Sequence, residues 1–221
     1  DVPFSIRTAE DVKKDIDLVK YWVDVFQQKA VPRNPSSDAD YEACSMAYHW
    51  IQSGMRSVFF QDGNSLLMNP DELTDVLEYL NATFPQIQRI TTYARSDTIN
   101  RLKPERLERY AQLKLNRFHI GLETGNDDIL KLMRKGVTKA DQIKAGIKAM
   151  AAGIEINEFY MPNMGGREYA KQSGPAGRYP AAPGAGLRSS RSGPASCPCP
   201  PAACPSAPVR YLRCGRCPPR W

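Results

Sequence analysis

Cysteine is scarce in most of this chain. The first 166 residues contain only Cys44, and the other five of the six cysteines lie in the last 25 residues. A single cysteine excludes a disulfide-stapled scaffold for the first 166 residues and is typical of a reducing compartment. No apolar run is long enough to span a bilayer, and the start lacks the basic and apolar regions of a signal peptide. We therefore expect a cytoplasmic enzyme fragment with no membrane contact, a fragment because no initiator methionine is present.

Acidic residues are almost absent from the end of the chain. Residues 167–221 hold nine Lys and Arg against the single acid Glu168, whereas residues 1–166 hold 21 against 23. The net charge of +6 therefore belongs to the tail, and the near-neutral body predicts no nucleic-acid partner. The tail also holds 11 of the 18 prolines and no Ile, Phe, Met, Asp or Asn. We predict a disordered, low-complexity tail over residues 167–221.

Strands and helices alternate in the body. Apolar or β-branched strands begin near Val58, Arg89, Arg117 and Ile154, and each is about one βα unit from the next. Helical periodicity and capping residues predict helices before and between the strands. Two precede the first strand, one beginning at Thr8 and one covering residues 39–54; the later helices begin at Asn69, Pro104, Asn126 and Thr138. Because the strands are short and almost wholly apolar, we expect both of their faces to be covered. The pattern predicts an α/β fold, a partial TIM-type (β/α) barrel with parallel strands over residues 1–166.

The strand that begins at Val58 is predicted to stop at Phe60 and to run into a polar loop made of Gln61, Asp62, Gly63 and Asn64. Loops at the carboxyl ends of parallel strands are where α/β proteins bind ligands. One interpretation is that the exposed backbone and Asn64 hold a small polar ligand. The others are a hairpin turn, which Asp-Gly favours, and an ordinary βα connection.

Two charged residues end the next strands. Glu123 follows the strand 117–122 and could meet a ligand hydroxyl at the barrel mouth, or it could cap the helix at Asn126. Arg95 follows the strand 89–94 and could hold a carboxylate or phosphate, or it could form a surface salt bridge. His119 lies inside a strand and is interpreted as a core histidine.

The remaining polar residues favour structural roles. His49 and Cys44 lie on a helix with no second ligand nearby, and Lys135 belongs to a basic helix face that we expect to be solvated. The tail cysteines suggest a zinc site, but they lack a second C-x₂-C pair and lie among prolines.

Five segments, in this order, carry a resemblance to a known family. They are Phe59–Asn64, Arg89–Arg95, His119–Thr124, Met133–Gly136 and Met161–Gly166. Together they resemble the radical SAM superfamily, with a core like those of the Elp3 and oxygen-independent coproporphyrinogen oxidase groups. The resemblance implies a [4Fe–4S] cluster and S-adenosylmethionine as cofactors, and reductive cleavage to a radical that abstracts hydrogen from a substrate of unknown identity. It also implies a reductant such as ferredoxin or flavodoxin.

The resemblance assigns a role to each strand end. Asp62, Gly63 and Asn64 match the loop that receives the methionine amino group, with Gln61 beside them. Glu123 matches the ribose-binding residue, and Arg95 is a candidate for the methionine carboxylate. The adenine side is matched by Met161, Pro162 and Asn163.

The chain departs from the family in two places. The family's C-x₃-C-x₂-C cluster motif would precede Asp1, and Cys44 cannot replace it because a cluster needs several converging thiolates. We therefore expect this chain alone to be inactive. After Gly166 the family continues with a helix and a strand, whereas here the composition changes abruptly, as in an out-of-frame translation.

Two other functions are compatible with the residues alone. A non-radical (β/α) barrel enzyme would share the strand–helix rhythm, although neither a strand-end lysine nor a late phosphate loop is present. A non-catalytic protein could instead bind metal or nucleic acid through its basic, Cys-rich tail.

Overall fold

The computed structural model describes residues 6–169, and residues 1–5 and 170–221 lie outside that description. Its sheet contains four parallel strands: β1 (Ser57–Asn64), β2 (Arg89–Ala94), β3 (Leu115–Glu123) and β4 (Glu155–Tyr160). Their order in space is β1-β2-β3-β4, the same as in the sequence. A sheet that grows at one edge without reversing direction is that of a βα barrel, because a doubly wound sheet has a switch point. The predicted partial TIM-type barrel is therefore confirmed.

Most helices begin at the predicted residues. The helices are α1 (Ala9–Phe26), α2 (Asp38–Gln52), α3 (Pro70–Thr83), α4 (Ser96–Arg101), α5 (Pro104–Gln112), α6 (Asp127–Leu132) and α7 (Lys139–Ala151), with 3₁₀ turns η1 (Ser65–Leu67) and η2 (Arg167–Tyr169). Thr8, Asn69 and Thr138 each cap a helix with a side-chain oxygen, as their sequence positions predict. The sequence did not predict α4, because six residues are too few to show a helical period.

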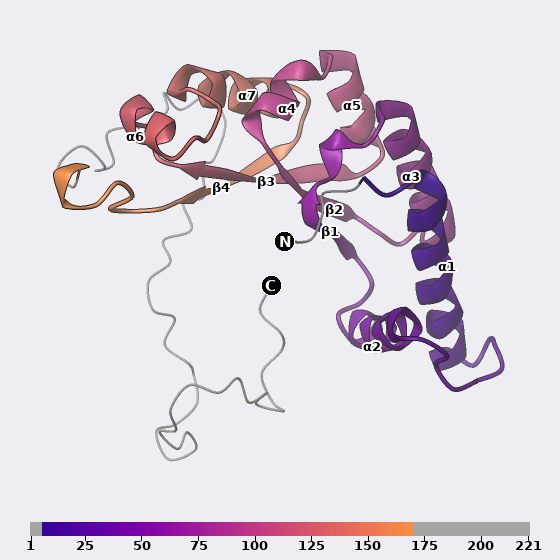
Figure 1. The fold of residues 1–221 in the computed structure, drawn as a ribbon. Coiled ribbons are helices and arrows are strands. Elements are labelled where there is room, and N and C mark those ends of the chain that lie inside the picture. The colour runs from indigo at the N-terminus through magenta and orange to yellow at the C-terminus, as the bar shows by residue number, and fades with distance from the viewer. Residues whose placement is uncertain (1–5, 170–221) are drawn as a thin grey trace, which may run out of the picture. The chain divides into compact units, whose positions relative to one another are not determined.

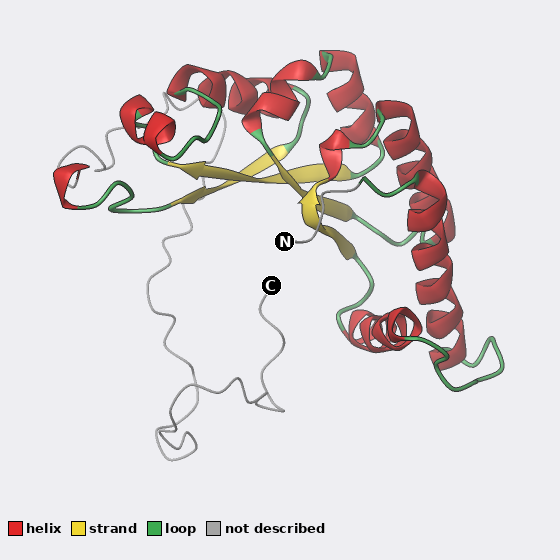
Figure 2. Cartoon of the chain, in the orientation of Figure 1, coloured by secondary structure: helices red, strands yellow, loops and turns green. Residues whose placement is uncertain are grey.

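Helices cover one face of the sheet among the described elements (Figures 1 and 2). Alternate strand residues point to that face, so Ile90, Phe118 and Ile120 are buried with Leu77 and Leu107. The expectation that both faces are covered is not met within residues 6–169. Buried and partly exposed residues alternate along the strands instead of forming continuous apolar runs. The second face of the sheet therefore carries side chains that a ligand can contact.

The first strand continues past its predicted end. Phe60 pairs with Thr92 and Asn64 pairs with Tyr93, so residues 61–63 form a bulge within β1 rather than the loop that follows it. Gly63 adopts a φ of 141°, which a residue with a Cβ rarely takes. The polar segment therefore remains attached to the sheet, and its backbone bulges out at the carboxyl end.

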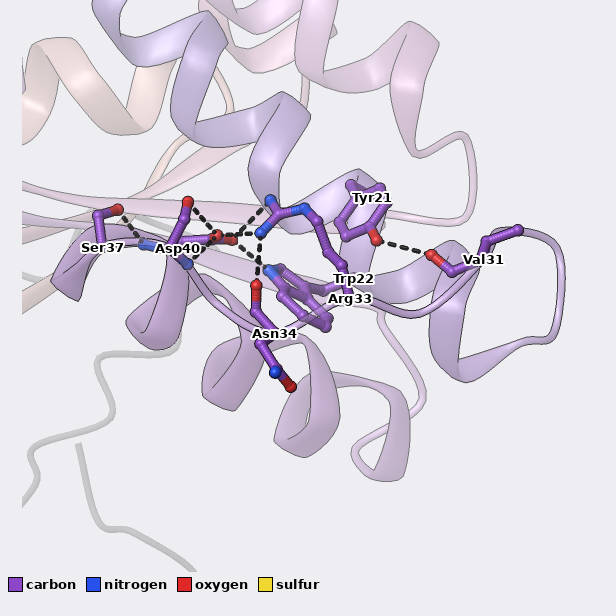
Figure 3. A network of polar contacts seen from close by, with 8 residues as sticks. Tyr21, Trp22, Val31, Arg33, Asn34, Ser37 and Asp40 are labelled. Atoms are coloured by element: carbon purple, nitrogen blue, oxygen red, sulfur yellow. Dashed lines mark hydrogen bonds and ion pairs between the residues drawn. The ribbon is translucent and has the colours of Figure 1, made fainter.

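The connection between α1 and α2 is fastened by one buried carboxylate (Figure 3). Asp40 is only 1% exposed and accepts hydrogen bonds from Trp22 Nε1 at 2.7 Å and from both the amide and hydroxyl of Ser36. Arg33 donates hydrogen bonds to the same carboxylate from both of its terminal nitrogens. These donors, the Arg33 guanidinium foremost, hold the pKa of Asp40 far below its usual range.

The predicted tail is only partly within the described residues. Arg167–Tyr169, its first three residues, form η2, so regular structure extends beyond Gly166. The tail's cysteines, its prolines and the suggested zinc site all lie outside the described residues.

Candidate functional site

Most of the side chains singled out from the sequence lie along one edge of the sheet. Asn64, Arg95, Glu123 and Met161 stand at or just after the ends of β1, β2, β3 and β4. Because the strands are parallel and adjacent ones lie about 4.8 Å apart, this edge measures about 15 Å from the first strand to the fourth. A row of that length can hold one elongated polar molecule.

Asn64 supplies the most distinctive polar group at this edge. Its Nδ2 donates to Thr98 Oγ1 on α4 at 2.5 Å, which fixes the amide so that its oxygen faces the other way. That Oδ1 is buried and has no hydrogen-bond partner among the described residues. A buried acceptor without a partner costs about 1–3 kcal/mol. A ligand that donates a hydrogen bond to Asn64 would remove this cost.

Four other side-chain amides also have unpartnered oxygens, but none of them ends a strand. They are Asn81, Asn100, Asn116 and Gln142. Three belong to helices, and Asn116 lies at the opposite edge of the sheet, near the start of β3. Asn64 alone among these amides stands where parallel sheets bind ligands.

The bulge before Asn64 leaves its backbone accessible at Gly63. Gln61 and Gly63 are exposed, and nothing lies within 4 Å of where a Cβ on Gly63 would stand. A ligand can therefore approach the Gly63 backbone directly. Asp62 contributes backbone to the same bulge.

Glu123 forms an ion pair that the sequence did not predict. Its Oε1 lies 2.9 Å from Lys135 Nζ, and both side chains are about four-fifths buried. Lys135 is therefore part of the candidate site, and the expectation that this lysine is solvated was wrong. Glu123 does not cap α6, because the Asn126 side chain accepts the bonds from that helix's first amides. A φ of 63° turns Glu123 out of the strand's regular direction.

A glycine makes room for this ion pair. A Cβ on Gly121 would lie 2.6 Å from Glu123 Oε1 and 3.0 Å from Lys135 Nζ, both of which are too close. The Glu123–Lys135 pair therefore folds over Gly121, on the open face of the sheet. The signal in the sequence was a glycine two residues before a strand-end carboxylate.

Arg95 is engaged by its own neighbourhood. Its Nε donates to Asp97 at 3.0 Å, and its Nη2 donates to the carbonyl of Lys135 at 2.8 Å. The salt bridge expected as its alternative role is present, and the second bond ties the end of β2 to the Glu123–Lys135 pair. Arg95 therefore positions its neighbours more directly than it offers a free guanidinium.

The fourth strand ends in an exposed turn. The amide of Met161 donates to the carbonyl of Glu123 at 2.9 Å, which joins the ends of β3 and β4. Met161, Pro162 and Asn163 are exposed, and Asn163 has a φ of 61°. Met161 thus lies next to Glu123, and the three residues present an apolar and amide surface.

His119 does not lie in the core. It is half-buried on the open face, where its ring contacts those of Phe59, Tyr93 and Phe159. Burial lowers the pKa of this imidazole, and the nearby Arg117 lowers it further. The ring is therefore neutral near pH 7. The interpretation as a core histidine was wrong. Successive side chains of a strand point to opposite faces of the sheet, and residue 119 points to the open face.

The sequence resemblance implies two cofactors, and the described residues fit one of them. For S-adenosylmethionine they fit, because Asn64 offers a buried acceptor with no partner and Glu123 a carboxylate. For an iron–sulfur cluster they do not fit. Cys44 is the one cysteine in residues 6–169, it lies half-buried on α2, and burial raises the pKa of its thiol. The described residues contain no cluster of three or more His, Cys, Asp or Glu that could bind metal.

The fold defines the class: a partial (β/α)-barrel protein whose polar strand-end residues gather at one edge of the sheet. Comparison with protein families identifies it further. The model described as the radical SAM superfamily matches residues 42–170, more than half of the chain. The chain belongs to the radical SAM superfamily, a superfamily of enzymes. This finding displaces the interpretation as a non-radical barrel enzyme. Comparison with curated proteins gave no match.

Solved structures with a similar fold include three radical SAM proteins. The archaeal Elp3 of Methanocaldococcus infernus, with an N-terminal deletion, aligns at TM-score 0.43 and 15% identity, covering 56% of this chain and 34% of that one. The cobalamin-dependent S-adenosylmethionine radical enzyme OxsB aligns at 0.43 and 18%, covering 61% and 20%. Coproporphyrinogen III oxidase (HemN) of Escherichia coli aligns at 0.44 and 11%, covering 73% and 33%. The chain therefore spans between 20% and 34% of the length of each of these proteins.

No helix in residues 6–169 is both long and apolar enough to cross a bilayer.

Proposed function

We propose that residues 1–166 bind S-adenosylmethionine along the carboxyl edge of the sheet, as the cofactor-binding part of a radical SAM enzyme. The observation that carries this proposal is the buried, unpartnered Oδ1 of Asn64. The methionine end of the cofactor carries an ammonium group, which donates hydrogen bonds and accepts none. An amide oxygen held in place by Thr98 is suited to receive it.

The other end of the cofactor carries ribose hydroxyls and adenine. Glu123 stands two strands away from Asn64, about 10 Å along the edge. Its carboxylate can accept bonds from vicinal hydroxyls while Lys135 holds its Oε1. The turn over Met161, Pro162 and Asn163 adds an exposed apolar surface beside Glu123, which suits a planar base.

The role of the cluster is separate from that of this edge. In radical SAM enzymes a [4Fe–4S] cluster supplies the electron that cleaves S-adenosylmethionine, and a ferredoxin or flavodoxin would reduce it. The described residues offer it no ligand set. We therefore propose that residues 6–169 bind the cofactor without cleaving it.

Equilibrium dialysis of the purified chain against radiolabelled S-adenosylmethionine tests the binding. We expect saturable binding at one site per chain, and a lack of saturable binding would defeat the proposal. A second assay tests inactivity. After anaerobic incubation with iron, sulfide and dithionite, we expect no 5′-deoxyadenosine, and its appearance would contradict that part of the proposal.

A further inference from the structure

The open face of the sheet carries one aromatic ring from each strand. These are Phe59 on β1, Tyr93 on β2, His119 on β3 and Phe159 on β4; we call them the ring row. Ring centroids of Phe59 and Tyr93 lie 4.9 Å apart, those of Tyr93 and His119 5.9 Å apart, and those of His119 and Phe159 5.5 Å apart. The row therefore runs unbroken across all four strands.

The ring row is separate from the core and open to solvent. Tyr93 is 38% exposed and Phe159 is 44% exposed, and no member belongs to the cluster of buried residues between sheet and helices. Strand residues on either side of these positions, such as Phe118 and Ile120, point into the core instead. Exposed contiguous rings of this kind mark binding surfaces more often than isolated apolar residues do.

Positive charge lies beside the row, toward the amino ends of the strands. Arg117 precedes His119 by two residues on the same face of β3, about 7 Å away along the strand. Both Arg117 and Arg89 bind the carboxylate of Glu155, at 2.5–2.9 Å and 3.4 Å. Two guanidinium groups therefore contact one carboxylate.

Toward the carboxyl ends, the row leads directly to the proposed cofactor edge. Gly121 follows His119 on the same face, and the Glu123–Lys135 pair folds over it. A molecule lying on the ring row would therefore meet the Glu123–Lys135 pair, which borders the cofactor edge.

We infer that the ring row and Arg117 bind a planar aromatic molecule that carries a carboxylate. The inference rests on the proposed function in one respect: this molecule would be the substrate, lying next to the bound cofactor. Its ring packs against the four aromatic side chains, and its carboxylate lies toward the guanidinium pair. Arg117 has five N–H donors, and its bonds to Glu155 involve only Nε and Nη2, so donors remain for a second carboxylate.

Three probes separate ring recognition from charge recognition on the full chain, with binding followed by NMR chemical-shift titration. The probes are 2-naphthoate, the neutral 2-naphthylmethanol and the non-aromatic cyclohexanecarboxylate. We expect 2-naphthoate to bind roughly tenfold more tightly than either of the others, because each lacks one of the two recognised groups. Equal affinity for all three probes, or no binding of 2-naphthoate, would overturn the inference.

Variants locate the site. Phe159→Leu keeps the apolar volume and should weaken 2-naphthoate by about fivefold, and Arg117→Gln should weaken it by about tenfold. Arg109→Gln is the matched control, since Arg109 forms a similar exposed ion pair with Glu78 on the helical side. Unchanged affinity in Phe159→Leu, or an equal loss in Arg109→Gln, would contradict the assignment.

Two further measurements separate this inference from its alternatives. The affinity for S-adenosylmethionine should be unchanged in Phe159→Leu. An error in the ring-row inference and an error in the proposed cofactor edge therefore give different results.

The open face could instead pair with a second copy of the chain. Concentration-dependent dimers that Phe159→Leu abolishes, without binding of 2-naphthoate, would replace the inference with self-association.

Discussion

Replacing Asn64 by alanine tests the cofactor edge most directly, because the structure predicts a large loss of affinity and little change in stability. The variant removes the Oδ1 acceptor that we assign to the ammonium group of S-adenosylmethionine. A hydrogen bond to a charged group contributes about 1.5–3 kcal/mol. Since each 1.4 kcal/mol is a factor of ten in Kd, the affinity should fall by about 10- to 150-fold.

The free energy of unfolding should change little. The variant loses one hydrogen bond, from Asn64 Nδ2 to Thr98 Oγ1, which contributes about 0.5–1.5 kcal/mol. It also removes an acceptor that is buried without a partner, which costs the wild-type chain about 1–3 kcal/mol. The two effects oppose each other, so we expect a net change within about 1 kcal/mol.

Asn116→Ala is the matched control. Asn116 also has a buried oxygen without a partner, and its Nδ2 donates to the carbonyl of Gln88 at 3.3 Å, but it lies at the other edge of the sheet. Calorimetric titration with S-adenosylmethionine and urea denaturation should be run on both variants. If Asn116→Ala weakens binding as much as Asn64→Ala, or if Asn64→Ala leaves binding unchanged, the reasoning about this edge is refuted.

Two further predictions concern the ion pair and the fastened connection. Gly121→Ala should weaken S-adenosylmethionine by several-fold in the same titration with little loss of stability, because the new Cβ displaces the flexible end of Glu123; unchanged affinity would contradict this role. Asp40→Asn should lower the Tm at pH 7, whereas Asp38→Asn, on the exposed first turn of the same helix, should not. Because the folded-state pKa of Asp40 lies below the ordinary 3.8, its stabilisation is complete above about pH 4 and is lost as the pH falls further. Thermal melts between pH 2 and 7 should therefore show the Tm of Asp40→Asn approaching that of the wild-type chain in acid. A Tm difference that stays constant with pH would refute the linkage.

Much of the fold could be predicted because its signals are local. Thr8, Asn69 and Thr138 begin helices because a short polar side chain can bond the free amides two or three residues ahead, and that geometry depends only on neighbours in sequence. The βα spacing likewise fixed the parallel arrangement, since parallel strands require a crossover. The length of β1 could not be predicted, because its bulge is stabilised by pairing with β2.

The candidate site divides along the same line. The sequence by itself determined the order and direction of the strands, and therefore that Asn64, Arg95, Glu123 and Met161 lie near one edge, although not that β1 extends to Asn64. It also determined membership of the radical SAM superfamily.

Only the tertiary structure decided what each of those side chains contacts. Lys135 pairs with Glu123 from twelve residues away, and Thr98 orients Asn64 from thirty-four residues away. The ring row likewise combines residues from four strands, one of which is His119. Such contacts depend on which strands become neighbours and on the face to which each residue points, and both are set when the sheet assembles rather than by any local pattern.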